Sequence, residues 1–388
     1  MHQLAAAVAV GAVVQAGAAA AEDLTIGMIT TLSGPGAGLG IDVRDGFNLA
    51  VEDLGGKFGE FDAEVIEADD QQKPDVAVQL AERLLSRDGA DIITGTIWSN
   101  LALATLPAVA RAGKIHISPN AGPSQLAGSQ CNRHFFNTAF QNDAVHEATG
   151  KVVADAGIRR VWLMAPNYPA GQDALRGFRH AYDASDGEVV DEVYTPLGQL
   201  DYAAEIAEIQ AAGPEAVYFF YPGGMGINFL KQWAQAGVGQ DVKLYASAFS
   251  VSQDILPAVG DAALGVESAA HWSPDLDAGI NQHFVEAFQE TYGRLPSLYA
   301  AQGYDTALFI DAAVKAAGSK DTDALIAALE SAEIDGTRGP IRLNTNHFPI
   351  QNFYGREVVK NDQGTLINRI KGTVYEDHAD AYVDECQM

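Results

Sequence analysis

Apolar and polar positions along the chain alternate between two periods. Short runs rich in β-branched residues predict strands, and segments with apolar residues three or four positions apart predict helices. The first part of the chain gives three strand–helix pairs, at 24–31 with 42–54, 64–68 with 74–87, and 91–94 with 99–112. This alternation is typical of a parallel sheet covered by helices.

The alternation starts again after Asp143 and predicts a second α/β lobe. Its helices and strands are expected at 145–156, 160–165, 171–183, 188–194, 202–212, 216–221, 226–237 and 243–247. Three helical stretches follow, and the chain then finishes in extended segments at 338–343, 353–360 and 365–371. Strands that follow helices in this way indicate that the chain passes between the lobes more than once.

We therefore expect two doubly wound parallel-sheet lobes that are joined by three short crossings and have a ligand cleft between them. The candidate crossings are 137–143, 269–274 and 344–348. Lobe 1 would comprise 22–140 with 273–345, and lobe 2 would comprise 141–272 with 346–388. Short multiple crossings form a hinge.

The first 21 residues have the pattern of a secretory signal peptide. Their apolar core, 4–14, is too short for a bilayer, which requires roughly 20 residues, and small residues precede the expected cleavage point. A Lys or Arg, usual near the start of such a leader, is missing. No Cys precedes Cys131, so we expect an exported protein in the periplasm without a lipid anchor.

The net charge of the chain argues against several classes of binding partner. The formal net charge is −27 for 388 residues, and it is spread without a long acidic block. Such a chain repels nucleic acid and anionic lipid, so we expect neither as a partner. No apolar run long enough for a membrane helix follows the leader, and a free monomer is expected.

The only two cysteines are Cys131 and Cys386. An oxidising compartment favours a disulfide between them, although two buried thiols remain the alternative. Neither lies in a motif that suggests a nucleophile.

Searches for catalytic motifs give no convincing enzyme site. The glycine-dense turn 34–40 does not fit G-x-G-x-x-G in any register, and we interpret it as a turn that lets backbone approach a neighbour closely. The histidines lack metal-ligand spacing, so no metal and no cofactor are predicted. We expect a binding protein, with an exported hydrolase of unrecognised site as the alternative.

Two polar turns follow predicted strands in the first lobe, at 95–100 and 118–124. Ligands of parallel sheets bind beyond the carboxyl ends of the strands, where both turns fall. The helix that starts at Ser99 offers unpaired N–H groups and a positive dipole end, which can hold a carboxylate without Lys or Arg. Ser99 and Asn100 add side-chain donors, although Ser99 could simply be a helix cap.

At this point the chain resembles the periplasmic substrate-binding proteins of ABC importers, of the branched-chain amino-acid type. The matching segments are 26–35, Asp69–Asp70, 91–95 with Ser99, 117–121 and 167–171, in order along the mature chain. The resemblance implies two α/β lobes, three crossings, a ligand held between the lobes, and a membrane permease as partner.

The resemblance also implies site residues. Ser99 falls on the hydroxyl that contacts the ligand carboxylate, Asn120 and Ala121 on a turn whose backbone meets the ligand, and Tyr168 on the aromatic of the second lobe. Two departures stand out: Gly122 replaces the usual Thr, and Ala248–Phe249 replaces the acidic residue that pairs an ammonium.

Loss of that acid argues against a free α-amino acid, because a buried ammonium without a partner costs several kcal/mol. We therefore expect an aromatic or other apolar carboxylic acid, with a branched-chain amino acid or amide as the alternative. Rings stack on rings, and the aromatic residues expected near the cleft are Trp98, Tyr168, Tyr221, Phe249 and Trp272. The full predicted ligand site is Trp98, Ser99, Asn100, Asn120, Ala121, Gly122, Tyr168, Tyr221 and Phe249.

Overall fold

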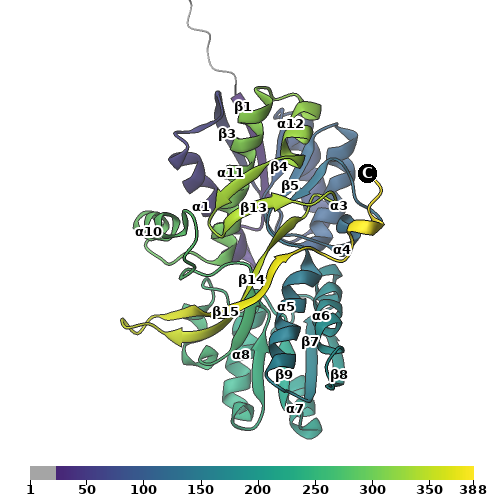
Figure 1. The fold of residues 1–388 in the computed structure, drawn as a ribbon, viewed down its shortest axis with the longest axis vertical. Coiled ribbons are helices and arrows are strands. Elements are labelled where there is room, and N and C mark those ends of the chain that lie inside the picture. Colours follow the sequence, from purple (N-terminus) through teal and green to yellow (C-terminus); the bar gives the residue numbers. More distant parts are fainter. Residues whose placement is uncertain (1–22) are drawn as a thin grey trace, which may run out of the picture.

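A computed structural model describes residues 23–388, and the predicted signal peptide lies outside the described residues. The first lobe contains a six-stranded sheet in the order β2-β3-β1-β4-β5-β6 (Figure 1). All neighbours pair in parallel except β2 with β3. The strands are β1 (Asp23–Thr30), β2 (Lys57–Phe58), β3 (Phe61–Asp69), β4 (Ile92–Thr94), β5 (Ile115–Ser118) and β6 (Phe135–Asn137).

Helices from two separate parts of the chain belong to this lobe. They are α1 (Ala37–Asp53), α2 (Pro74–Ser86), α3 (Ser99–Arg111) and α4 (Ser124–Ala127), and later α10 (Asn281–Tyr292), α11 (Leu298–Ala317) and α12 (Thr322–Glu330). Glycines let α1 and α11 pack backbone to backbone: a Cβ at Gly46 would lie 1.9 Å from the carbonyl oxygen of Ala300. The first lobe is therefore complete only after the chain has returned from the second lobe.

The second half of the glycine-dense turn, 37–40, is part of the helix α1, which begins at Ala37 and not at Asp42 as the pattern predicted. The interpretation as a close backbone approach is confirmed. A Cβ at Gly40 would lie 2.1 Å from the carbonyl oxygen of Thr31, and a Cβ at Gly36 would lie 2.7 Å from Cζ2 of Trp98. Glycine here lets the start of α1 lie against the exit of β1.

The second lobe is a parallel sheet extended by antiparallel strands. Its strands are β7 (Arg160–Pro166), β8 (Glu188–Thr195), β9 (Ala216–Phe219), β10 (Lys243–Ala246) and β11 (Glu267–Ala270), which pair in parallel. Next to β11 come the antiparallel strands β14 (Pro349–Lys360) and β15 (Leu366–His378). Its helices are α5 (Asn142–Asp155), α6 (Pro169–Tyr182), α7 (Ala203–Ala212), α8 (Gly224–Ala236) and α9 (Leu256–Val259). The α/β fold of two lobes is as the sequence predicted.

Three connections join the lobes, between β6 and α5, between β11 and α10, and through β14. The hairpin β12 (Glu333–Gly336) and β13 (Gly339–Leu343) pairs with the start of β14, which then runs on to pair with β11 (Figure 1). Arg338 ties two connections together: its Nη1 lies 2.7 Å from Oδ2 of Asp305, and its Nη2 donates to the carbonyl of Thr138. Because both ions are buried, the ion pair fixes this part of the hinge.

The segment after β15 returns to the first lobe. Cys131, in the loop before β6, forms a disulfide with Cys386. Tyr382 packs against a small apolar cluster that includes Leu126 and Phe348, and Asp380 accepts hydrogen bonds from Asn346. The sequence-based division gave all of 346–388 to lobe 2, whereas these contacts place the last residues beside lobe 1.

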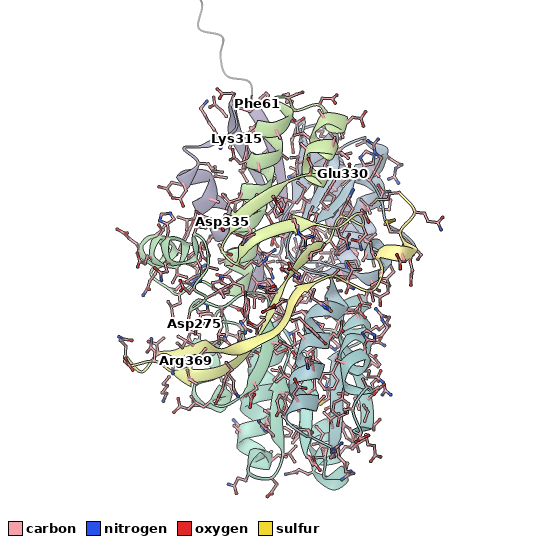
Figure 2. The ribbon with its side chains drawn as sticks, viewed as in Figure 1. Phe61, Asp275, Lys315, Glu330, Asp335 and Arg369 are labelled. Carbon is pink, nitrogen blue, oxygen red and sulfur yellow. A yellow bond between two sulfur atoms is a disulfide. The ribbon has the colours of Figure 1, made fainter. Side chains whose placement is uncertain are left out.

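The exterior of both lobes carries many oxygen-bearing side chains (Figure 2), as expected from the high negative charge. Within residues 23–388, no helix combines the length and apolar character that crossing a bilayer requires.

The disulfide predicts a redox-dependent stability. Its half-cystines are 255 positions apart, and a chain-entropy model gives about 5 kcal/mol for a loop of this size. We expect reductant to lower the midpoint of thermal unfolding by several degrees, measured by calorimetry with thiol titration to verify reduction. The double variant Cys131→Ser/Cys386→Ser is the control and should not respond to reductant. An unchanged midpoint in fully reduced protein would contradict the prediction.

Candidate functional site

A cavity lies between the lobes, at the carboxyl ends of strands from both sheets. Its volume is about 20 Å³, little more than a water molecule occupies, so the lining side chains nearly meet. Larger hollows of about 360 and 670 Å³ lie elsewhere on the molecule, but neither is at these strand exits. The cavity is lined by Leu39, Ile97, Trp98, Ser99, Asn120, Phe140, Asn142, His146, Tyr168, Ala170, Phe220, Pro222, Phe249 and Tyr299.

The amino end of α3 provides the polar part of the cavity. Ser99 is the first helical residue, and the capping position, Trp98, makes no side-chain cap hydrogen bond. The first N–H groups of a helix have no partner within the helix, and the dipole there is positive. The Ser99 hydroxyl accepts a hydrogen bond of 3.1 Å from Asn142 of the second lobe. A ligand carboxylate at this point would meet N–H donors and a hydroxyl.

Hydrogen bonds fix the two turns that the sequence singled out. The Trp98 indole Nε1 donates to Thr31 Oγ1 at 2.9 Å, and that hydroxyl donates to Asp70 at 2.6 Å. Asn120 joins the turns to each other, because its Nδ2 donates to the carbonyl of Ile97 at 2.7 Å. The segment with Asp69–Asp70 therefore holds a cavity wall in place.

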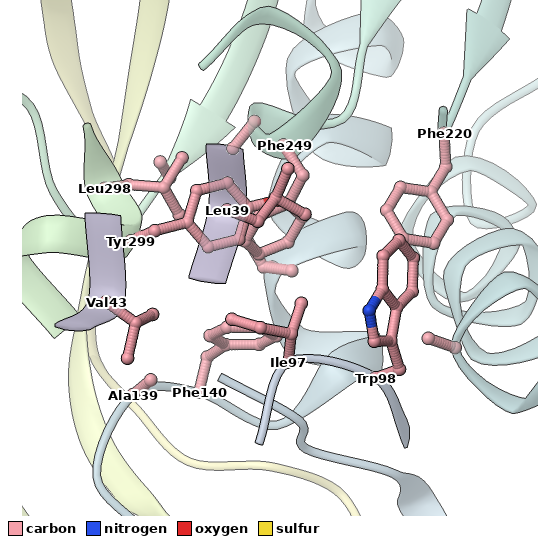
Figure 3. Close-up of a cluster of buried hydrophobic side chains, with 14 of the residues drawn as sticks. Leu39, Val43, Ile97, Trp98, Ala139, Phe140, Phe220, Phe249, Leu298 and Tyr299 are labelled. Carbon is pink, nitrogen blue, oxygen red and sulfur yellow. The ribbon is translucent and has the colours of Figure 1, made fainter. Parts of the chain in front are cut away.

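Aromatic rings form the walls of the cavity (Figure 3). Tyr168 lies with its ring centroid 6.1 Å from Trp98 and 6.3 Å from Phe220. Phe249 lies 4.9 Å from Phe140 and 5.8 Å from Tyr299. A ring that contacted these walls would gain about 0.5–1.5 kcal/mol for each ring pair beyond the burial of its apolar area.

No Lys, Arg, Asp or Glu of residues 23–388 lines the cavity. Phe249, in the segment where the family has an acidic residue, presents a ring to it. Burial lowers the pKa of His146 to about 3, so this side chain is neutral at physiological pH. The described lining consequently has no group of fixed charge, and the amino end of α3 contributes a positive dipole to the cavity.

The structure brings together five of the nine predicted site residues: Trp98, Ser99, Asn120, Tyr168 and Phe249 line the cavity. The other four, Asn100, Ala121, Gly122 and Tyr221, are not among the lining residues.

Local packing explains the side-chain positions of two of these four residues, Ala121 and Tyr221, and of Trp272. The side chain of Ala121 belongs to the apolar cluster beneath the C-terminal segment. Tyr221 bonds Thr195 at 3.0 Å and packs on Phe229 inside the second lobe. Trp272 likewise turns away from the cavity, since its Nε1 donates to Asn281 at 2.8 Å.

Sequence reasoning missed several lining residues, above all Phe140, Asn142, His146, Phe220 and Tyr299. Phe140 and Asn142 fall in the predicted crossing 137–143. Because a crossing between the lobes borders the cleft, this position could have marked both residues as candidates for the lining. Phe220 lines the cavity because β9 ends at Phe219, earlier than the apolar run predicted. Nothing in the local pattern marks His146 or Tyr299.

Comparison with known proteins identifies the family. Residues 23–364 match the profile of the periplasmic binding protein family. A Leu/Ile/Val-binding protein homolog of Brucella melitensis is 28% identical over 361 residues, covering 91% of this chain and 92% of the relative.

Solved structures of ABC transporter solute-binding proteins have the same fold as this chain. An ABC transporter solute-binding protein from R. palustris in complex with benzoate is 32% identical, with a TM-score of 0.88, and covers 94% of this chain and 100% of its own. One from Rhodopseudomonas palustris BisB5 in complex with 3,4-dihydroxybenzoic acid is 30% identical, with the same TM-score, covering 92% and 99%. The chain therefore belongs to the periplasmic binding protein family and is similar throughout its two lobes to solute-binding proteins of ABC transporters.

Proposed function

We propose that this protein captures an aromatic or other apolar carboxylic acid in the periplasm and delivers it to an ABC permease. The observation that carries the proposal is the amino end of α3, which opens into a ring-lined cavity without charged lining residues. Helix amides and the Ser99 hydroxyl suit a carboxylate, while the rings suit an apolar body. The benzoate and dihydroxybenzoate complexes of similar proteins support this ligand class.

A branched-chain amino acid is the second candidate, supported by the name of the Brucella relative. Its ammonium group would need an anionic partner in a cavity this enclosed. No Asp or Glu of the described chain lines the cavity, so an ammonium there would be uncompensated. The ligand without an ammonium is favoured for this reason.

Contacts between the lobes support capture by closure. The amide of Gly224, at the start of α8, donates to the carbonyl of Pro35 at 3.1 Å. Asp173 of α6 accepts hydrogen bonds from the amide and hydroxyl of Ser124, at 3.0 and 2.8 Å. These pairs and the bond between Asn142 and Ser99 connect the two lobes. A ligand that touches both lobes would stabilise this closed form over an open one.

An acidic pair at the rim opposes closure. Asp254 of the second lobe lies against α1, where its Oδ2 would be 3.8 Å from a Cβ at Gly38. Burial and, next, the negative charge of Asp42 raise the pKa of Asp254 to about 7. Arg294 pairs with Asp42 at 2.5 Å and also with Asp45, so its single positive charge only partly offsets the two carboxylates. The ionised form of Asp254 therefore disfavours the closed state.

Titration calorimetry tests the proposed function. Purified protein should bind benzoate and other aromatic acids one to one without product formation, and should bind them more tightly than leucine. Product formation would show an enzyme, and tighter binding of leucine would overturn the ligand class.

Within the same experiment, Ser99→Ala should weaken aromatic-acid binding about ten- to hundredfold, because hydrogen bonds to charged groups contribute about 1.5–3 kcal/mol. The matched control is Ser86→Ala. Its hydroxyl is at the exposed end of α2 and bonds only the carbonyl of Glu82, so affinity should not change. Equal affinities of the wild type and Ser99→Ala for the acid would contradict the proposed position of the ligand carboxylate at Ser99.

Ligand affinity should depend on pH through Asp254. In an open form, solvated Asp254 would titrate near the ordinary value of 3.8, and in the closed form at about 7. The closed state is thus favoured at low pH and loses stability as pH rises between these values, with a plateau above. Calorimetry should show at least roughly tenfold weaker binding at pH 8 than at pH 5.5. Asp254→Asn should flatten this profile, and a profile equally steep in the variant would contradict the assignment.

A further inference from the structure

His146 is a polar side chain at the apolar end of the cavity. It is located on α5, is 2% exposed and lines the cavity between two rings, with centroid distances of 5.0 Å to Phe220 and 6.1 Å to Phe249. Neither ring offers it a hydrogen bond. Because buried polar groups are normally hydrogen-bonded, we expect this imidazole to have polar partners.

Only one of its nitrogens has a partner in the protein. Nδ1 is hydrogen-bonded to the hydroxyl of Tyr218, which is buried in β9. Within residues 23–388, no hydrogen bond reaches Nε2, and this atom is not among the fully enclosed polar atoms that lack a partner. Since the two nitrogens of an imidazole point in diverging directions, Nε2 is the one available to a ligand in the cavity.

The neutral ring restricts what that ligand group can be. Burial keeps His146 uncharged, so one nitrogen donates a hydrogen bond and the other accepts one. If Tyr218 donates to Nδ1, then Nε2 carries the proton and needs an acceptor. If Nδ1 donates to Tyr218, then Nε2 needs a donor. A hydroxyl group meets either need, whereas a ring C–H meets neither.

The helix α5 sets the distance between His146 and the carboxylate end. Asn142 donates to Ser99 Oγ, so it marks the end at which the carboxylate is expected. His146 follows four positions later and therefore lies on the same face of α5, about 6 Å further along its axis. A ring that starts at Ser99 would thus point its far edge toward His146.

We propose that His146 selects acids whose aromatic ring carries a hydroxyl opposite the carboxylate. This inference rests on the proposed function and deepens it from aromatic acids in general to 4-hydroxylated ones. His146 would bond that hydroxyl directly, and Tyr218 would orient the imidazole.

The test compares benzoate, 2-hydroxybenzoate and 4-hydroxybenzoate by calorimetry on the full chain. The wild type should bind 4-hydroxybenzoate about tenfold more tightly than benzoate, the fold-change expected for one buried hydrogen bond. The hydroxyl of 2-hydroxybenzoate lies beside the carboxylate and would not reach His146. We therefore expect 2-hydroxybenzoate to bind no more tightly than benzoate. Equal binding of the 2- and 4-hydroxy acids would overturn the inference without any variant.

Variants then assign the effect to the side chain. His146→Leu should abolish the preference by weakening 4-hydroxybenzoate while benzoate binding persists, and His146→Gln should restore part of it, because an amide both donates and accepts. The control is His116→Gln, a buried histidine of the first lobe that bonds Thr96 at 3.0 Å outside the cavity, and it should keep the wild-type ratio. Thermal unfolding verifies that each variant is folded.

The outcomes separate the two proposals. A wild type that binds benzoate and 4-hydroxybenzoate equally, or a preference that survives in His146→Leu, overturns the role of His146 and leaves the proposed function standing. A wild type that binds none of the three acids overturns both.

Discussion

The constraint on which the site depends is the burial of a helix amino end in a cavity whose described lining has no cation. Amides at the start of α3 have no partner within the helix, and the lining residues of the described chain include no Lys or Arg. Such a site favours a small anion through dipoles and hydrogen bonds alone. An ammonium there would lack a counter-ion, because the described lining includes no Asp or Glu. The ligand class that we propose follows from this balance of charge.

Hydrogen bonds from both lobes hold the amino end of α3 in place against the second lobe. The exit of β1 fixes Trp98 through Thr31 and Asp70, and Asn142 reaches Ser99 from the start of α5. Both contacts come from segments far apart in sequence. The buried pair of Arg338 and Asp305 anchors the connections around which the lobes would move.

The C-terminal segment adds a constraint that the two-lobe description alone does not contain. After β15 the chain returns to the first lobe, where the disulfide of Cys386 with Cys131 fixes it. On the way, the hydroxyl of Tyr382 reaches Asp143 at 3.1 Å and accepts a hydrogen bond from Arg176 of α6 at 2.8 Å. Asp143 begins the second lobe, so this segment spans the hinge and couples its geometry to a covalent bond.

The sequence by itself determined the βαβ alternation, the two lobes and the strand exits that hold Trp98, Ser99 and Asn120, because periodicity and helix starts are local properties. It could not place Tyr221, since a strand that ends two residues earlier changes which residue meets the cavity. The contributions of His146 and Tyr299 were decided by tertiary structure alone. Their positions depend on how α5 and α11 pack across the lobes, and no local pattern encodes that packing.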